Sequence, residues 1–216
     1  MSDLIDLTHL GLGPLFVVQG DLEQRTDEAL VTEANTALHM TSGIAGSLRK
    51  AGGIEIHKEA ITLGPLAVGR VGRTGAGKLV ARVLYHAVLV DFFIGHGMSA
   101  KVIASVLPEL LALARQDGVA TIAMPLFGGG GGLKASVALE AIVEGLEAGE
   151  RAPDDALAIT FVVREADEFA AVRELVKDLK AGDARRDEEN DVAAGYLAEL
   201  MAGMGDLGDM GDFEFE

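Results

Sequence analysis

A run of five consecutive glycines is the part of this sequence best suited to hold an anion. The run follows an apolar stretch that ends at Met124 and precedes a segment of helical spacing that begins at Ala135. Residues without a side chain let successive backbone N–H groups approach a ligand closely, at an entropic cost. A strand, a glycine loop and a helix N-terminus in this order form a phosphate-binding arrangement. The expected phosphate loop consists of Phe127, Gly128, Gly129, Gly130, Gly131 and Gly132, and a flexible surface loop is the alternative.

A second polar group follows another strand-like stretch, which ends near Val31. Asn35 carries both a hydrogen-bond donor and an acceptor, which suits the hydroxyl groups of a sugar, although asparagine also caps turns. A loop of small residues then opens a helical segment, where backbone N–H groups attract anions. This loop consists of Ser42, Gly43, Ile44, Ala45 and Gly46.

Two titratable side chains lie beside this second group and are candidates for acid–base work. Glu33 stands at the end of the strand, and His39 lies in the loop before the small residues. The alternatives are a carboxylate exposed in a turn and an ordinary loop histidine. His57 is expected at the surface, and His86, within a strand, is expected to be packed or hydrogen-bonded.

A further glycine-rich segment, residues 72–79, nearly matches the P-loop of nucleoside-triphosphate hydrolases. Leu79 stands where that pattern requires a Ser or Thr to ligate magnesium. The residues that follow, through Val90, have the character of a strand rather than of a helix. The sequence therefore predicts a turn between two strands here, and no triphosphate hydrolysis.

Composition excludes several classes of chemistry. The 216 residues include no Cys, which excludes disulfides, thiolate metal sites and a cysteine nucleophile. The His residues show no metal-ligand spacing, so we expect neither a metal nor a cofactor. The net charge of -16 argues against binding in the grooves of DNA or RNA. A single nucleotide remains compatible, because local N–H groups hold phosphate against a screened field.

The elements that must position these groups alternate between strand and helix. Short stretches rich in Val and Leu predict strands at residues 15–18, 28–31, 66–71, 82–90, 120–124 and 157–163. Apolar residues at helical spacing predict helices at 43–51, 54–62, 99–115, 135–146 and 167–179. This alternation argues for an α/β sheet with helices on both faces, in which ligands bind beyond the carboxyl ends of the strands.

The chain divides into two parts of different composition. Residues 1–182 carry the alternating elements and are expected to form one nucleotide-binding domain. Residues 183–216 hold 11 of the 34 acidic residues, and we expect a largely disordered acidic tail with a short helix inside it. A solvating tail and a docking peptide for a protein partner are the two alternatives for this segment.

Targeting signals are not found in the sequence. The N-terminus lacks the pattern of a signal peptide, and the apolar stretches fall short of the roughly 20 residues that span a bilayer. We therefore expect a cytoplasmic protein that does not contact a membrane.

Several short motifs, taken in order, resemble the macrodomain family of ADP-ribose binders. Gly20-Asp21-Leu22 is similar to the family's Gly-Asp-Ile start, and Val31 to Asn35 is similar to its Val-Asn-Ala-Ala-Asn segment. Further similarity lies in residues 43–48, 74–86 and 123–132, which resemble its first loop, a strand pair and its second phosphate loop. The resemblance covers roughly residues 13–180 and implies a three-layer α/β/α sandwich with a mixed, mostly parallel central sheet.

The resemblance also implies roles for individual residues. Asp21 would accept a hydrogen bond from the adenine amino group, Leu22 would offer its backbone nearby, and Asn35 would bind the distal ribose. The two small-residue loops would hold the diphosphate from both sides without a metal. Arg164 stands where the family often has an aromatic residue over the adenine, and a stacked guanidinium and a solvated charge are the alternatives.

Departures from the family pattern bear on activity. Thr32 replaces the first Asn, and Ala45 stands where hydrolases of the family carry an acidic residue. We therefore expect a module that binds ADP-ribose, a related adenine nucleotide metabolite or an ADP-ribosylated macromolecule without hydrolysing it. Two alternatives stay open: an ADP-ribosyl-protein or O-acetyl-ADP-ribose hydrolase that uses Glu33 or His39, and an interaction scaffold with a degenerate cleft and a working acidic tail.

Overall fold

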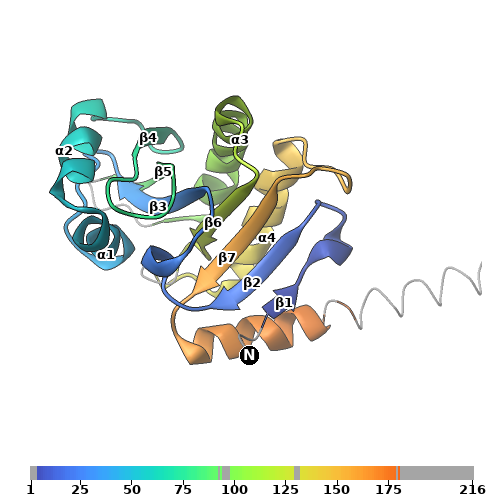
Figure 1. The fold of residues 1–216 in the computed structure, drawn as a ribbon. Helices are drawn as coiled ribbons and strands as arrows, with labels where there is room; N and C mark the ends of the chain where they lie inside the picture. Colours follow the sequence, from blue (N-terminus) through green and yellow to red (C-terminus); the bar gives the residue numbers. More distant parts are fainter. Residues whose placement is uncertain (1–3, 92, 94–97, 129–131, 179, 181–216) are drawn as a thin grey trace, which may run out of the picture. The chain divides into compact units, whose positions relative to one another are not determined.

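The structure is a computed structural model that describes residues 4–91, 93, 98–128, 132–178 and 180. The chain separates into two units, Met1–Arg173 and Glu174–Glu216. The first unit carries the whole sheet (Figure 1). The expected acidic tail at 183–216, with its short helix, lies outside the described residues.

Seven strands form one sheet in the order β1-β2-β7-β6-β3-β5-β4. Along the chain they are β1 (Leu4–Asp6), β2 (Leu15–Gln19), β3 (Ala29–Asn35), β4 (Val71–Gly75), β5 (Val83–Val90), β6 (Thr121–Pro125) and β7 (Ala158–Val163). The five central strands are parallel to one another; they are β2, β7, β6, β3 and β5. The edge strands β1 and β4 are antiparallel to theirs. The carboxyl ends of five strands therefore meet at one edge of the sheet.

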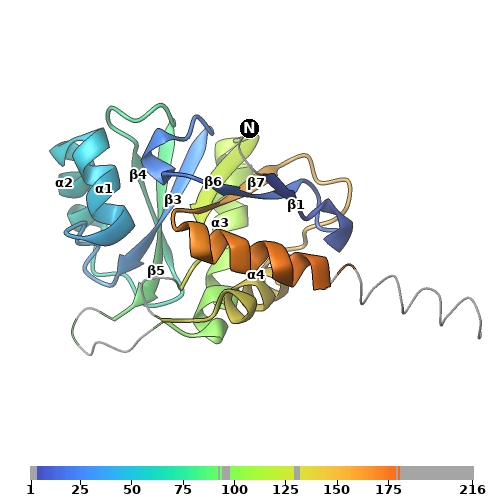
Figure 2. The same cartoon turned by 90° about the horizontal axis from the view of Figure 1, so that it is seen from below.

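Helices connect the parallel strands. They are α1 (Gly43–Gly52), α2 (Ile54–Leu63), α3 (Ala100–Asp117) and α4 (Ala135–Ala148), with single 3-10 turns η1 (Thr8–Leu10) and η2 (Leu22–Gln24). A further helix covers residues 166–178. Helices α1 and α2 lie on one face of the sheet, and α3 and α4 lie on the other (Figures 1 and 2). The expected three-layer α/β/α sandwich with a mixed, mostly parallel sheet is confirmed.

Apolar side chains fill the space between the sheet and helices α1 and α2. Leu30 of β3 and Leu84 of β5 are fully buried there against Leu48 of α1 and Ile56 of α2. On the other face α3 and α4 approach closely at Gly145, where an added Cβ would lie 2.6 Å from the Ala104 carbonyl oxygen. These contacts fix both helix layers, and with them the start of α1, against the strand ends.

Two expected elements differ from the structure. The predicted strand at 66–71 is wrong, because only Val71 is extended and pairs with β5, and β4 runs on from there to Gly75. Strand β1 was not expected, since three residues are too few to show a period. Among the described residues, no helix combines the length and the apolar character needed to cross a membrane.

Candidate functional site

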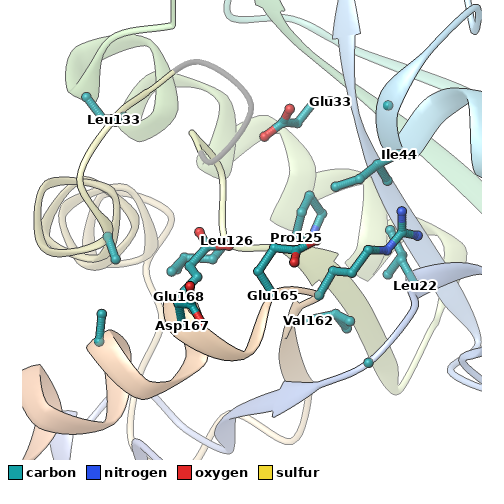
Figure 3. A pocket seen from close by; sticks show the side chains of 15 residues that line it. Leu22, Glu33, Ile44, Pro125, Leu126, Leu133, Val162, Glu165, Asp167 and Glu168 are labelled. Carbon is teal, nitrogen blue, oxygen red and sulfur yellow. The ribbon is translucent and has the colours of Figure 1, made fainter.

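A cavity of about 630 Å³ opens at the carboxyl ends of the parallel strands (Figure 3). Its walls include Gly20 and Leu22 after β2, Glu33 of β3, Pro125 of β6 and Val162 of β7. A second cavity of about 450 Å³ shares Glu33, Gly43 and Ile44 with the first and extends to Asn35 and to Val90 at the end of β5. All five parallel strands thus contribute to two adjoining cavities, which we call the cleft.

The first turn of α1 forms one wall of the cleft. Ser42 is the N-cap residue, but its side chain makes no hydrogen bond to the helix. The N–H groups at the start of a helix have no partner within the helix, so they can donate hydrogen bonds to a ligand anion. Gly43, Ile44 and Ala45 border the cleft, whereas the Gly46 N–H donates to the Ser42 carbonyl at 2.9 Å. Gly43 has φ +58°, a left-handed conformation that favours glycine.

The Asn35 side chain closes a turn and also borders the cleft. Its Oδ1 accepts the N–H groups of Ala37 at 3.1 Å and His39 at 3.2 Å. Its Nδ2 donates to the His39 carbonyl at 3.2 Å. This is the turn-capping role that the sequence left as the alternative. A sugar hydroxyl would meet an amide that is held rigidly by these three bonds.

Asp21 and Arg164 form an ion pair at the end of the cleft that lies near β2 and β7. Arg164 Nε lies 2.7 Å from Asp21 Oδ1, and Arg164 Nη2 lies 3.0 Å from Glu23 Oε2. The other Asp21 oxygen accepts from Gln24 Nε2 at 3.0 Å. Arg164 and Leu22 line the cavity, and Asp21 stands behind the guanidinium rather than in the wall. Arg164 is exposed, which agrees with the solvated charge weighed as one alternative, and its guanidinium lies between two carboxylates.

The glycine run is joined to the cleft by a hydrogen bond from its first residue, Gly128, to Glu33, which lines both cavities. Phe127 is buried in the core, and Gly128 is buried with φ +108°. The Gly128 N–H donates to Glu33 Oε1 at 3.1 Å. Gly132 is exposed with φ +74°, and it is Leu133 and Ala135 that reach the cavity wall. The three middle glycines, Gly129, Gly130 and Gly131, lie outside the described residues.

Glu33 lies at the junction of the two cavities. Burial raises the pKa of its carboxyl group, the Gly128 N–H acts in the opposite direction, and the Glu168 carboxylate raises the pKa further. Burial also raises the pKa of Glu168, and the neighbouring Glu165 adds to that effect. Figure 3 shows Glu33 together with Glu165, Asp167 and Glu168 in the lining of the first cavity. Glu33 is therefore a half-buried, hydrogen-bonded group and not a carboxylate exposed in a turn.

His39 and His57 stand side by side near the second cavity, with ring centroids 6.1 Å apart. His39 borders the cavity, and His57 Nδ1 accepts the Met40 N–H at 3.3 Å. Burial lowers the pKa of His57, and Arg49 and His39 lower it further. His57 is partly exposed, in agreement with the expected surface position, and its ring also supports the loop through its hydrogen bond with Met40. In the described part of the chain, no three His, Asp or Glu side chains gather as metal ligands would.

His86 is packed within the sheet, as expected. It is fully buried on β5, and its Nε2 lies 2.9 Å from Thr74 Oγ1. Burial lowers the pKa of the His86 ring to about 4. The side chain is thus neutral at ordinary pH and takes no part in the cleft.

The segment that nearly matches a P-loop contains the end of β4 and the start of the turn, residues 76–82, that joins β4 to the antiparallel strand β5. The Lys78 N–H donates to the Gly52 carbonyl at 2.9 Å, which joins the turn to the last residue of α1. Gly77 has φ +60°, and an added Cβ would collide with the same carbonyl oxygen. The segment has a structural role and does not border the cleft.

Several cleft residues were not assigned a site role from the sequence. The acidic group comes from the start of the helix at 166–178, where Asp and Glu are common because they complement the helix dipole. Pro125 and Val162 end buried strands and carry no chemical signal of their own. Only their position could have indicated them, because each is at the carboxyl end of a strand, where ligands bind in sheets of this kind. The added members are Gly20, Ala34, Thr41, Val90, Met98, Pro125, Leu126, Leu133, Ala135, Val162, Glu165, Asp167, Glu168 and Ala171.

Comparisons with known proteins agree with this architecture. The family model "Macro domain" matches residues 31–142, just over half of the chain. An uncharacterized protein of Aeropyrum pernix is 38% identical over 136 residues, which is 61% of this chain and 70% of that protein.

Solved structures share the fold at low identity. The Oceanobacillus iheyensis macrodomain with ADP has a TM-score of 0.67 and 21% identity, and the match covers 84% of this chain and 99% of that one. The Trypanosoma brucei macrodomain in complex with ADP-ribose has a TM-score of 0.64 and 21% identity, with 77% of this chain and 71% of that one covered. From the matched family model and the shared architecture together, this chain belongs to the macro domain family.

Proposed function

We propose that the chain binds ADP-ribose, or an ADP-ribosylated macromolecule, in the cleft at the carboxyl ends of the five parallel strands. The observation that carries the proposal is the meeting of the α1 N-terminus with all five strand ends around two adjoining cavities. Related macrodomains have been solved with ADP and with ADP-ribose.

The parts of such a ligand correspond to different walls of the cleft. The Arg164 guanidinium, held by Asp21 and Glu23, offers a flat cationic surface for the adenine. The N–H groups at the start of α1, with the partial positive charge of a helix N-terminus, suit the diphosphate. The second cavity, bordered by Asn35, Ser42 and His39, suits the distal ribose and whatever is attached to it.

Calorimetric titration of the full chain with ADP-ribose tests this proposal. The expected result is saturable binding of one ligand per chain, with GDP-ribose as the matched ligand in which only the base is changed. Absence of heat and of a thermal shift at millimolar ADP-ribose, at both mildly acidic and neutral pH, would leave the chain as a scaffold with an unused cleft.

Hydrolysis of ADP-ribosyl or O-acetyl-ADP-ribosyl bonds is a second candidate function, favoured by one observation. Glu33 is a half-buried carboxylate with a raised pKa at the junction of the cavities, and this is the environment of many general acids. Against it, Ala45 provides no ionisable group on the α1 wall. Incubation with mono-ADP-ribosylated protein separates the candidates: turnover that is lost in Glu33→Gln, with binding retained, identifies an enzyme.

A further inference from the structure

Glu33 lines the cleft and already occupies the backbone amide of Gly128, a buried residue. Its Oε1 accepts the Gly128 N–H at 3.1 Å, and its side chain borders both cavities. Gly128 opens the glycine run, and Leu126 and Phe127 separate it from the end of β6 at Pro125. A carboxylate and a phosphate oxygen are equivalent acceptors for such a group, because both are anionic oxygens that form charge-assisted hydrogen bonds. The protein thus places an anion of its own where a ligand's anion would find a donor.

The charged residues around Glu33 also disfavour an anionic ligand. From the helix at 166–178 and the residues just before it, Glu165, Asp167 and Glu168 face the same cavity. Among the described residues that line it, Arg164 is the one cation, and Asp21 and Glu23 already pair with it.

The other elements that pack around Glu33 offer little positive charge. Lys134 is exposed, and it is its neighbours Leu133 and Ala135 that line the wall. From α1 comes only the partial charge of the helix N-terminus, and from the loop before α1 comes His39, in the second cavity. A diphosphate would therefore enter a cavity whose side chains carry an excess of negative charge.

We propose that Glu33 is an internal competitor of the ligand's diphosphate, which holds the Gly128 amide in the free protein and must be displaced or protonated when a nucleotide binds. The proposal rests on the nucleotide binding proposed above and adds to it a residue that sets affinity and couples it to pH. The carboxylate that lowers affinity at neutral pH becomes a neutral carboxylic acid in mild acid, and its repulsion of the phosphates is then lost.

The direction of the pH dependence follows from linkage. Burial and Glu168 raise the pKa of Glu33 above its ordinary value already in the free protein. A bound diphosphate favours the protonated form, so the pKa rises further in the complex and binding takes up a proton. Affinity is therefore highest below the pKa of free Glu33 and falls as pH rises through the raised pKa of the complex. His39 borders the second cavity, so every variant in the comparison retains it.

The experiment compares four full-length chains by calorimetric titration with ADP-ribose at about pH 5.5 and about pH 8. They are the wild type, Glu33→Gln, Glu33→Ala and Glu165→Gln. Glu165→Gln removes one carboxylate from the same cavity without touching the Gly128 amide, and all four chains keep His39. At about pH 8 both Glu33 variants are expected to bind about tenfold more tightly than the wild type, because a charge-assisted hydrogen bond no longer competes. Their affinity is also expected to change less between the two pH values.

Each outcome decides the matter. Proton uptake in the wild type, measured from the dependence of the heat on the buffer, and its loss in Glu33→Gln support the competitor role. An equal gain in affinity in Glu165→Gln and Glu33→Gln means that the total negative charge of the cavity lowers affinity, rather than the contact with the Gly128 amide. That result overturns the competitor role. Binding by the wild type with no gain in either Glu33 variant overturns it while leaving nucleotide binding intact. Absence of binding in all four chains at both pH values removes the proposed function itself, and the competitor role with it.

Discussion

Arg164 Nε lies 2.7 Å from Asp21 Oδ1, so the loop after β7 is joined to the segment after β2. These two strands are neighbours in the sheet, and the ion pair fixes a planar cation over their ends. The pair is partly exposed, with 43% of the Arg164 side chain and 38% of the Asp21 side chain accessible. Its role in stability is therefore small, and its role in shaping the cleft can be tested separately.

Affinity for ADP-ribose in Arg164 variants should depend on whether the new side chain is planar rather than on whether it is charged. If the guanidinium plane stacks on the adenine, Arg164→Phe retains most of the affinity for ADP-ribose. Arg164→Lys and Arg164→Ala then lose about fivefold. Unfolding free energies should stay within about 1 kcal/mol of the wild type, because the ion pair is exposed. Calorimetry and denaturant unfolding measure the two quantities, and an affinity order in which Lys equals Arg and exceeds Phe would exclude stacking.

A matched pair of glycines separates backbone strain from ligand contact. Gly43 has φ +58° and Gly53 has φ +99°, and an added Cβ meets no atom within 4 Å at either position. Replacement of either residue by Ala should lower the unfolding free energy by about 1 kcal/mol. Gly43→Ala should also weaken ADP-ribose binding about tenfold, because its amide borders the cleft, whereas Gly53→Ala should not. Equal affinities in the two variants would show that the α1 amides do not hold the ligand.

Restoring an acidic residue on the α1 wall tests why the chain would lack hydrolase activity. Ala45→Asp places a carboxylate at the second cavity, beside the expected site of the distal ribose. A positioned general base contributes about 10²–10⁴-fold in rate, so release of ADP-ribose from a modified protein should become measurable. Ala45→Asn has the same size without the base and serves as the control. Identical inactivity of the two variants, with binding retained, would place the defect elsewhere in the cleft.

His86 should make the fold sensitive to mild acid. Its pKa is about 4 in the folded chain and 6.5 when unperturbed, so between these values the unfolded state binds a proton that the folded state does not. Stability is therefore lost as pH falls from about 6.5 toward 4. Between about pH 7 and pH 5 the wild type should lose about 2 kcal/mol more than His86→Gln, as measured by urea unfolding. Parallel pH curves for the two chains would contradict the assignment of this loss to His86.

Sequence periodicity was sufficient for the layered architecture, because helices and buried strands bury different spacings of apolar residues. The five-strand parallel core and the site at its carboxyl end follow from that alternation. The irregular segment before Val71 was misjudged, since a short Val- and Leu-containing stretch fits a strand and a loop equally well. The composition of a short segment does not determine whether it pairs with a strand of the sheet.

The site was harder to anticipate where side chains from distant segments meet. Asn35 and Gly43 were visible as motifs, but the contact of Glu33 with Gly128 joins residues 95 positions apart. Similarly, Arg164 was weighed as a stacked guanidinium or a solvated charge, and its partners Asp21 and Glu23, which lie more than 140 positions earlier, were not anticipated. Such pairings depend on strand order in the sheet, which no local pattern encodes.

The turn between β4 and β5 has a consequence for how this sequence can change over generations. The Lys78 N–H donates to the carbonyl of Gly52, the last residue of α1, and Gly77 packs closely against the same carbonyl. The opposite end of α1 borders the cleft. A larger residue at Gly77 would push α1 along its axis and shift its first turn. Selection on ligand affinity would therefore also act on Gly77, a position that contacts no ligand. In a lineage that retains binding, the residues of this turn should vary as little in sequence as the residues that line the cleft.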